Sequence, residues 1–385
     1  MKNIKNTIAV FLLLFTVIAC NEENWLKETA LDIYSPENMF VDQEQLNSAI
    51  AKIYSDVAVA NYGSRNNSAL MVGGLADNLY HFYDPSFTNS NLYKQLVPEG
   101  DLPSFCWENF YKNIFDSNVI LSRIEDVEFS SEKEKKALKA EAFFFRAYAY
   151  KNLAILFGGV PLILEEITEP KRDFVRASRE DVLTQVISDL KFAAENLPDV
   201  TELKEDGRLT KAAASHVLTE VYLITKDWDN AISSATSVIN NPNYSLMTER
   251  FGAWKDKPGD VFRDLFIRNN QNRHCAGGPN TEGIWVGQFE FNVPGGGRSP
   301  QGPRMYGIWY WSLTGKDGKN LFFGHSSQNG GRAFGFYANN DYLNHDIWEV
   351  DWEDMRNSEY NIRRDMVADN PASAYYGQKI VENNA

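Results

Sequence analysis

The sequence predicts a mainly α-helical protein in which a scaffold of paired helices carries an irregular, loop-rich region with short strands. Two observations lead to this fold class. Helix start signals and apolar stripes of helical spacing recur from residue 42 to about residue 240. After about residue 250 this pattern is lost, and glycines and aromatic residues become frequent instead.

The helices of the first part are predicted from their caps and breakers. An N-cap oxygen lies three residues before a side chain that can bond back to the cap in the pairs Asp42 with Gln45, Ser131 with Glu134, and Ser178 with Asp181. Thr210 and Asp227 are further N-cap candidates. Breakers follow at Gly158-Gly159, Pro198 and Asn241-Pro242. The predicted helices cover residues 42–58, 104–124, 131–157, 178–197, 210–225 and 228–240.

One pair of these helices matches a known repeat template. The tetratricopeptide spacing is met by Leu218, Tyr222, Ala231 and Ala235, although Ala235 replaces the usual aromatic residue and Pro242 closes the unit one residue early. Small residues at 231 and 235 allow two antiparallel helices to pack closely. The scaffold is therefore predicted to consist of tetratricopeptide-like helical pairs.

The second part has an unusual composition. Residues 261–342 hold 15 of the 25 glycines and 15 aromatic residues. Glycine allows tight turns and close backbone approach, while aromatic rings supply rigid apolar faces. This stretch is predicted to form long ordered loops with short strands, such as Ile284 to Phe291, because its aromatic content argues against disorder.

The N-terminus has the parts of a secretory signal in order. Lys2 and Lys5 precede the apolar run 8–18, which is about half the length needed to cross a bilayer. Val17-Ile18-Ala19-Cys20 then matches a bacterial lipobox, in which Cys20 becomes the acylated N-terminus. Lipidation, with palmitate as one acyl chain, would anchor the mature protein to a membrane. A plain signal peptide with a chance cysteine is the alternative.

The charge of the chain argues against a nucleic-acid-binding protein, and its cysteine content argues against a disulfide-rich protein. Removal of Lys2 and Lys5 leaves 36 basic residues (38 − 2) against 52 acidic ones, a net charge of −16. Such a surface repels nucleic acid, so no nucleic-acid partner is expected. Cys106 and Cys275 could pair, but two cysteines do not make a disulfide framework, and free buried thiols are favoured.

No catalytic constellation is found, so the sequence predicts no enzyme, no metal site and no cofactor. The histidines lack metal-ligand spacing, and the glycine-rich segments lack nucleotide-loop spacing. Acidic residues are too numerous for any pair to be nominated as a glycosidase acid and base. Glu141 and Arg146 lie on an otherwise apolar helix, and we interpret them as structural groups that are buried and paired.

Several segments together resemble the SusD/RagB family of Bacteroidetes nutrient-binding lipoproteins. The resemblance runs from Cys20 almost to the end of the chain. It is carried by residues 107–124 (WENFYKNIFDSNVILSRI), 140–161 (AEAFFFRAYAYKNLAILFGGVP), 189–198, 207–211 (GRLTK), 212–246 and the short Asp354-Met355-Arg356 element.

The resemblance implies a lipid-anchored protein of the outer membrane, where the acidic pair Glu22-Glu23 resembles a surface-export signal. The implied partner is a SusC-like TonB-dependent transporter, to which an oligosaccharide or a peptide is delivered. The expected domains are a signal peptide (1–20), a tether (21–41), the helical scaffold (42–250) and a loop-rich ligand-binding region (251–385). Family members usually continue into further helices, so this chain is expected to be truncated.

A sugar site needs an aromatic floor with polar groups at its edge, because a sugar ring presents a C–H face and hydroxyls. Two regions, 78–83 and 304–311, offer this mixture. The predicted ligand-binding residues are Asn78, Tyr80, Tyr83, Arg304, Tyr306, Trp309 and Trp311.

Three alternatives stay open at this point. The protein could bind peptides, as RagB-like proteins do. It could be a surface glycoside hydrolase, which would need two carboxylates about 5 to 9 Å apart. It could also be an adaptor that binds only the transporter. In addition, each predicted ring could belong to the core of the loop region instead of a binding site.

Overall fold

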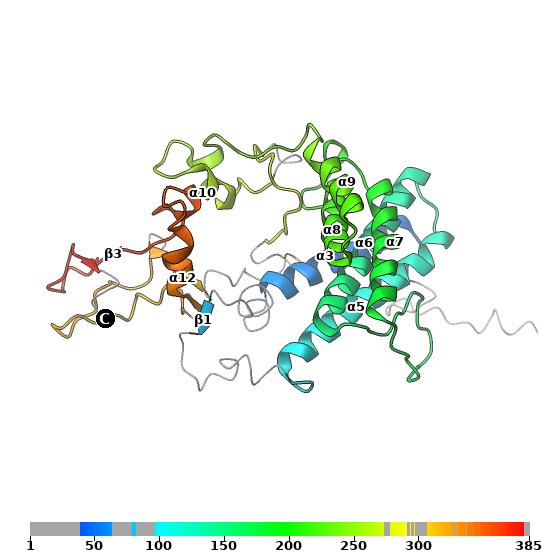
Figure 1. Cartoon of the computed structure of the whole chain (residues 1–385), viewed down its shortest axis with the longest axis horizontal. Coiled ribbons are helices and arrows are strands. Elements are labelled where there is room, and N and C mark those ends of the chain that lie inside the picture. The colour runs from blue at the N-terminus through cyan, green and yellow to red at the C-terminus, as the bar shows by residue number, and fades with distance from the viewer. Residues whose placement is uncertain are drawn as a thin grey trace, which may run out of the picture.

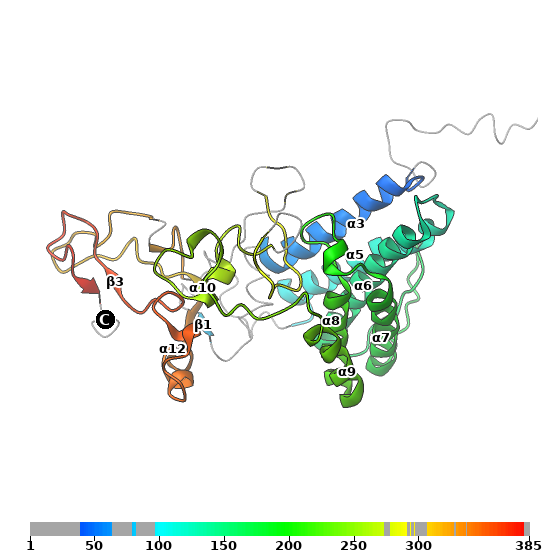
Figure 2. The same cartoon turned by 90° about the horizontal axis from the view of Figure 1, so that it is seen from above.

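The computed structural model describes residues 39–63, 79–81, 97–272, 278–290, 293, 296, 306–326, 329–335 and 337–380. Within these ranges, six long helices follow one another and form one lobe, at the right in Figure 1 and again in the view from above (Figure 2). They are α3 (Gln43–Ala58), α5 (Asp101–Arg123), α6 (Glu132–Phe157), α7 (Arg179–Asn196), α8 (Lys211–Thr225) and α9 (Trp228–Ile239). None of the helices in the described ranges is both long and apolar enough to cross a membrane.

The predicted N-caps are confirmed. A backbone N–H three residues further on donates to the side chain of each of Asp42, Ser131, Ser178, Thr210 and Asp227. Helix α5 begins at Asp101, earlier than predicted, because a proline such as Pro103 is tolerated in the first turn.

The predicted return bond forms at one cap, where the Ser178 hydroxyl donates to the Asp181 carboxylate at 2.7 Å, and was wrong for Gln45 and Glu134. Gln45 instead accepts hydrogen bonds from the backbone of Phe40 and Val41. The Glu134 carboxylate accepts from Gln43, at 3.3 Å, and from Lys204, at 3.4 Å. Backbone donors of residues 40 and 41 at the first cap, and donors from distant segments at the second, therefore take the place of the return bond.

One hydrophobic core unites the helices. Each helix packs against the next along the chain from α5 to α9, and α3 packs against α5 and α6. Ile50 and Ile53 of α3 and Phe144, Phe145 and Tyr150 of α6 are fully buried in this core. Each such side chain contributes about 1.5 to 3 kcal/mol by leaving water. Alanines along α6 allow its neighbours to approach closely on several sides.

Two ion pairs lie inside this scaffold. The Arg146 guanidinium donates to both oxygens of Asp189 at 2.8 Å, and both side chains are buried. Glu141 lies 3.3 Å from the Nε of Arg208. The prediction that Glu141 and Arg146 are buried and paired is confirmed, each with a partner on another segment.

The turn before α8 explains why glycine stands at 207. Gly207 has a positive φ of +81°, and a side chain there would meet Gln288 at 2.5 Å. Its carbonyl accepts a hydrogen bond from Trp285, at 3.0 Å. The Gly207-Arg208 segment thus joins the scaffold to the residues around 285.

The strand predicted from Ile284 to Phe291 does not form in its described part, residues 284–290. The Trp285 ring instead enters the scaffold, where its neighbours are the rings of Tyr54, Phe144, Phe145 and Tyr148. This segment is therefore held by the packing of the Trp285 ring and not by hydrogen bonds to a partner strand.

Beyond residue 250 the described elements are short. They are η5 (Gly252–Trp254), α10 (Val261–Phe266), β2 (Tyr337–Asn339), α12 (Asp341–Asn344), η7 (Asp346–Trp348), η8 (Met355–Asn357), β3 (Met366–Val367) and β4 (Lys379–Ile380). β2 pairs antiparallel with β1 (Leu79–His81), and β3 pairs antiparallel with β4. A small second core contains Tyr310, Leu321, Phe322, Met366 and Ala368. These elements form the left part of Figure 1.

Candidate ligand-binding site

Strand pairing brings the two predicted ligand-binding regions close together. In the β1–β2 register, Tyr80 lies opposite Ala338 and His81 opposite Tyr337. Just before β2, Gly335 adopts a φ of +61°, and a methyl group there would lie 3.4 Å from the backbone nitrogen of Trp309. The backbone of Tyr80 therefore lies beside β2, and that of Trp309 lies beside Gly335, two residues before β2.

Four rings gather in this region, and we call them the Trp309 cluster: Trp309, Trp311, His325 and Phe334. The ring centroids of Trp309 and Trp311 are 5.5 Å apart, and those of Trp311 and His325 are 4.7 Å apart. The Phe334 ring lies 6.4 Å from Trp309 and 6.3 Å from Trp311. Both indoles are half-buried, so they can offer part of their surface to a ligand.

A local turn brings the two indoles together. The N–H of Tyr310 donates to the carbonyl of Ile308 at 3.0 Å, and the N–H of Leu313 donates to the carbonyl of Tyr310 at 3.1 Å. Tyr310 is fully buried, with its hydroxyl donating to the carbonyl of Gly331 at 2.9 Å and accepting from the N–H of Ser326 at 2.8 Å. The indole of Trp311 donates to the carbonyl of Ala333 at 2.9 Å. These bonds hold the cluster in place.

Polar groups lie at the edge of the cluster. The guanidinium of Arg332 is exposed and lies 5.3 Å above the Phe334 ring. It forms no ion pair with a carboxylate in the described ranges. Tyr306 is 36% exposed, and burial raises the pKa of its hydroxyl, which therefore stays protonated at neutral pH. The arrangement suits stacking of an apolar face together with hydrogen bonding at the edge.

The predicted residues are not all placed by the structure. Trp309 and Trp311 lie in the Trp309 cluster, Tyr306 precedes Trp309 by three residues in the chain, and the backbone of Tyr80 lies in β1. Asn78, Tyr83, Arg304, Cys20 and Cys275 lie outside the described residues. Cys106 is a buried free thiol, and burial raises its pKa to about 11.

Sequence reasoning missed His325, Arg332 and Phe334. The only sequence feature that could have pointed to these three residues is the high aromatic and glycine content of residues 261–342. No short-range spacing relates them to Trp309. They join the cluster because the chain turns back after the buried residues Leu321 and Phe322.

A second surface feature is an apolar groove of about 290 Å³ beside α5. Trp107, Phe115 and Phe174 line it and are partly exposed. Its polar atoms are already used: the Tyr111 hydroxyl donates to the carbonyl of Pro161 at 2.7 Å, and the Asn118 amide donates to two further carbonyls. The groove therefore suits apolar side chains better than a ligand rich in hydroxyls.

Metal chemistry finds no support in the described part of the chain. There, no group of three or more His, Cys, Asp or Glu side chains is arranged to hold a metal ion.

Comparison with known proteins finds related sequences. The profile of a SusD-like family, described as starch-binding and associating with the outer membrane, matches residues 25–223. SusD-like protein P25 of Formosa agariphila is 25% identical over 313 residues, which are 76% of this chain and 53% of that protein. The chain thus spans about half the length of the curated relatives that it matches.

Solved structures share the fold. A SusD-like carbohydrate-binding protein from Bacteroides fragilis superposes with a TM-score of 0.57 at 22% identity, covering 73% of this chain and 51% of that one. A structure described as containing a xylogluco-oligosaccharide gives a TM-score of 0.50 at 26% identity, covering 64% of this chain and 46% of that one.

Proposed function

Because this chain belongs to the SusD-like family, we propose that it binds an oligosaccharide at the outer membrane and delivers it to a SusC-like TonB-dependent transporter. The Trp309 cluster is the observation that carries this proposal, since it combines half-buried rings with donors at their edge. The starch-binding description of the family and the xylogluco-oligosaccharide of one relative support a glycan as the ligand. Recognition would proceed without bond making or breaking.

The cellular setting is part of the same proposal. Acylation of Cys20 would tether the protein to the outer membrane, with the acidic pair Glu22-Glu23 directing it to the cell surface. The apolar groove beside α5 is a suitable contact for apolar side chains of the transporter. The glycan site and this groove use different residues, so ligand and transporter could be held together.

Separate Trp309→Ala and Trp311→Ala variants test the site. If the rings form the floor, each loss should weaken glycan binding by about 1 to 3 kcal/mol, by analogy with stacking on aromatic side chains, and leave the fold intact. A core role would instead appear as about 3 to 5 kcal/mol of lost stability. A glycan array followed by calorimetry and thermal melts separates these results. Trp228→Ala, which removes an exposed indole from α9, is the matched control.

The same assays discriminate the other functions. Binding of peptides but not glycans would favour a RagB-like peptide carrier. Shortened oligosaccharides after incubation would show a hydrolase. If the protein bound the transporter but had no affinity for any ligand, its function would be that of an adaptor.

A further inference from the structure

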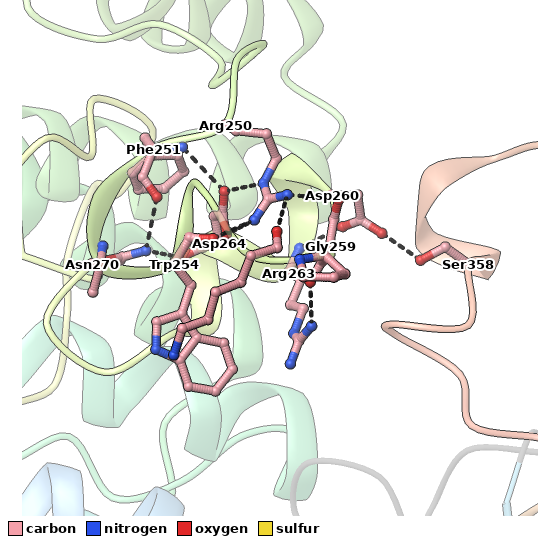
Figure 3. Close-up of polar contacts among 12 residues, drawn as sticks. Arg250, Phe251, Trp254, Gly259, Asp260, Arg263, Asp264, Asn270 and Ser358 are labelled. Carbon is pink, nitrogen blue, oxygen red and sulfur yellow. Dashed lines mark hydrogen bonds and ion pairs between the residues drawn. The ribbon is translucent and has the colours of Figure 1, made fainter. Parts of the chain in front are cut away.

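A single arginine organises the turn that precedes α10 (Figure 3). The Nε of Arg250 donates to the buried carboxylate of Asp264 at 2.6 Å. The terminal N–H groups of Arg250 donate to the second carboxylate oxygen of Asp264 at 3.1 Å and to the carbonyls of Trp254, Lys257 and Gly259 at 2.7 to 2.9 Å. Because the guanidinium is tied to a buried partner, the turn 254–259 is held in one conformation.

This turn presents a tryptophan between two cations. The ammonium of Lys257 lies 4.5 Å from the centre of the Trp254 ring, and the guanidinium of Arg263 lies 4.9 Å from it. In Figure 3 the side chains of Trp254 and Arg263 both extend away from Arg250, on the opposite side of the turn.

A distant segment adds a second ring. Asp260 caps α10, accepts from the hydroxyl of Ser358, and accepts from the amide of Asn361 at 2.9 Å. These bonds place Tyr360 beside α10, where the guanidinium of Arg263 lies 5.6 Å from its ring centre. Tyr360 is 39% exposed and so keeps ring surface available.

The two cations lack carboxylate partners. Neither Lys257 nor Arg263 forms an ion pair within the described ranges, whereas Lys52, Lys112 and Arg356 do. Arg263 donates to the carbonyl of Pro258 at 3.0 Å and keeps further N–H groups for a ligand.

The carboxylates of Asp260 and Asp264 are engaged elsewhere. Asp264 is bound by Arg250 and by the N–H of Phe251, and Asp260 is bound by Ser358 and Asn361. Lys257 and Arg263 thus present positive charge close together on a chain of net charge −14, and an anionic ligand would complement them.

We propose that Trp254, Lys257, Arg263 and Tyr360 form a subsite for an acidic sugar unit, one that carries a carboxylate or a sulfate. The anionic group accepts charge-assisted hydrogen bonds from Arg263 and Lys257. The C–H face of the sugar packs on the exposed surface of Tyr360. Trp254 holds both cations through its ring. This inference rests on the proposed function, because it names the class of glycan that the protein selects.

The test compares acidic oligosaccharides with matched neutral ones. Galacturonan, alginate and chondroitin sulfate oligosaccharides are titrated beside their carboxyl-reduced or desulfated counterparts. At least one acidic form should bind about tenfold more tightly than its neutral counterpart, a preference that added salt weakens. The double variant Lys257→Gln with Arg263→Gln should bind both forms equally. Lys191→Gln, which removes an exposed charge from α7, should keep the preference.

The outcomes separate this inference from the proposed function. The subsite is refuted if no acidic form is preferred, or if the double variant, with its melting temperature unchanged, keeps the preference. Neutral glycan binding that Trp309→Ala abolishes would then leave the proposed function standing. Failure of every oligosaccharide in the panel to bind would overturn both.

Discussion

Replacing Glu141 with glutamine should remove a loss of stability that the protein suffers between pH 5 and pH 8. Burial raises the pKa of the Glu141 carboxyl from 4.5 to about 7, and attraction to Arg208 offsets only part of this effect. Within the described ranges, its Oε2 is buried without a hydrogen-bond partner. Folding therefore favours protonation of Glu141 relative to the unfolded chain.

The direction and the magnitude of this change of stability with pH follow from the difference between the folded and unfolded pKa values. A carboxyl whose pKa is raised by folding binds its proton more tightly in the folded state. Its contribution to stability is complete below pH 4.5 and is lost as the pH rises through about 7. The difference between these two pKa values corresponds to about 3 kcal/mol.

Urea unfolding at pH 5, 6, 7 and 8 measures this effect. The wild-type midpoint should fall across the series, and Glu141→Gln should show a much smaller fall because an amide does not titrate. Glu195→Gln, which changes an exposed carboxylate on α7, should behave like the wild type. An equal fall in wild type and Glu141→Gln would refute the reasoning.

Three further predictions concern the scaffold and the anchor. Asp189→Ala leaves the buried Arg146 guanidinium without its carboxylate, so it should cost about 3 to 5 kcal/mol in urea unfolding; a loss below about 1 kcal/mol would contradict this role. Gly207→Ala forces a side chain into a positive φ and against Gln288, so it should lower stability by about 1 to 3 kcal/mol in the same assay, and an unchanged midpoint would argue against the strain. Cys20→Ala should abolish palmitate incorporation and release the protein from membranes, and equal labelling of the variant would refute the lipobox.

The helical scaffold could be predicted because its signals are local. Cap residues such as Ser131 and Thr210 bond to a backbone only three residues away, so sequence neighbours suffice to place a helix start. The predicted strand at 284–291 was wrong for the opposite reason. A strand requires a partner, and the large Trp285 ring gained more by entering the scaffold core.

The candidate site could be predicted only in part. Trp309 and Trp311 are two residues apart, so a local turn is enough to bring their rings together. Phe334 and Arg332 join them through a turn of the chain, and β1 reaches β2 across most of the sequence. Such long-range pairings leave no periodic pattern to detect.

The sequence by itself determined the helical pairs, the burial of Glu141 and Arg146 and the family to which the chain belongs. Several of the motifs that carry the family resemblance serve the scaffold: Arg146 pairs with Asp189, and Gly207 receives Trp285. Only the tertiary structure decided which rings meet, which buried charges pair, and where Lys257 and Arg263 remain available. The physical reason is that helix formation depends on residues within one or two turns, whereas a binding surface depends on segments that only the folded chain brings together.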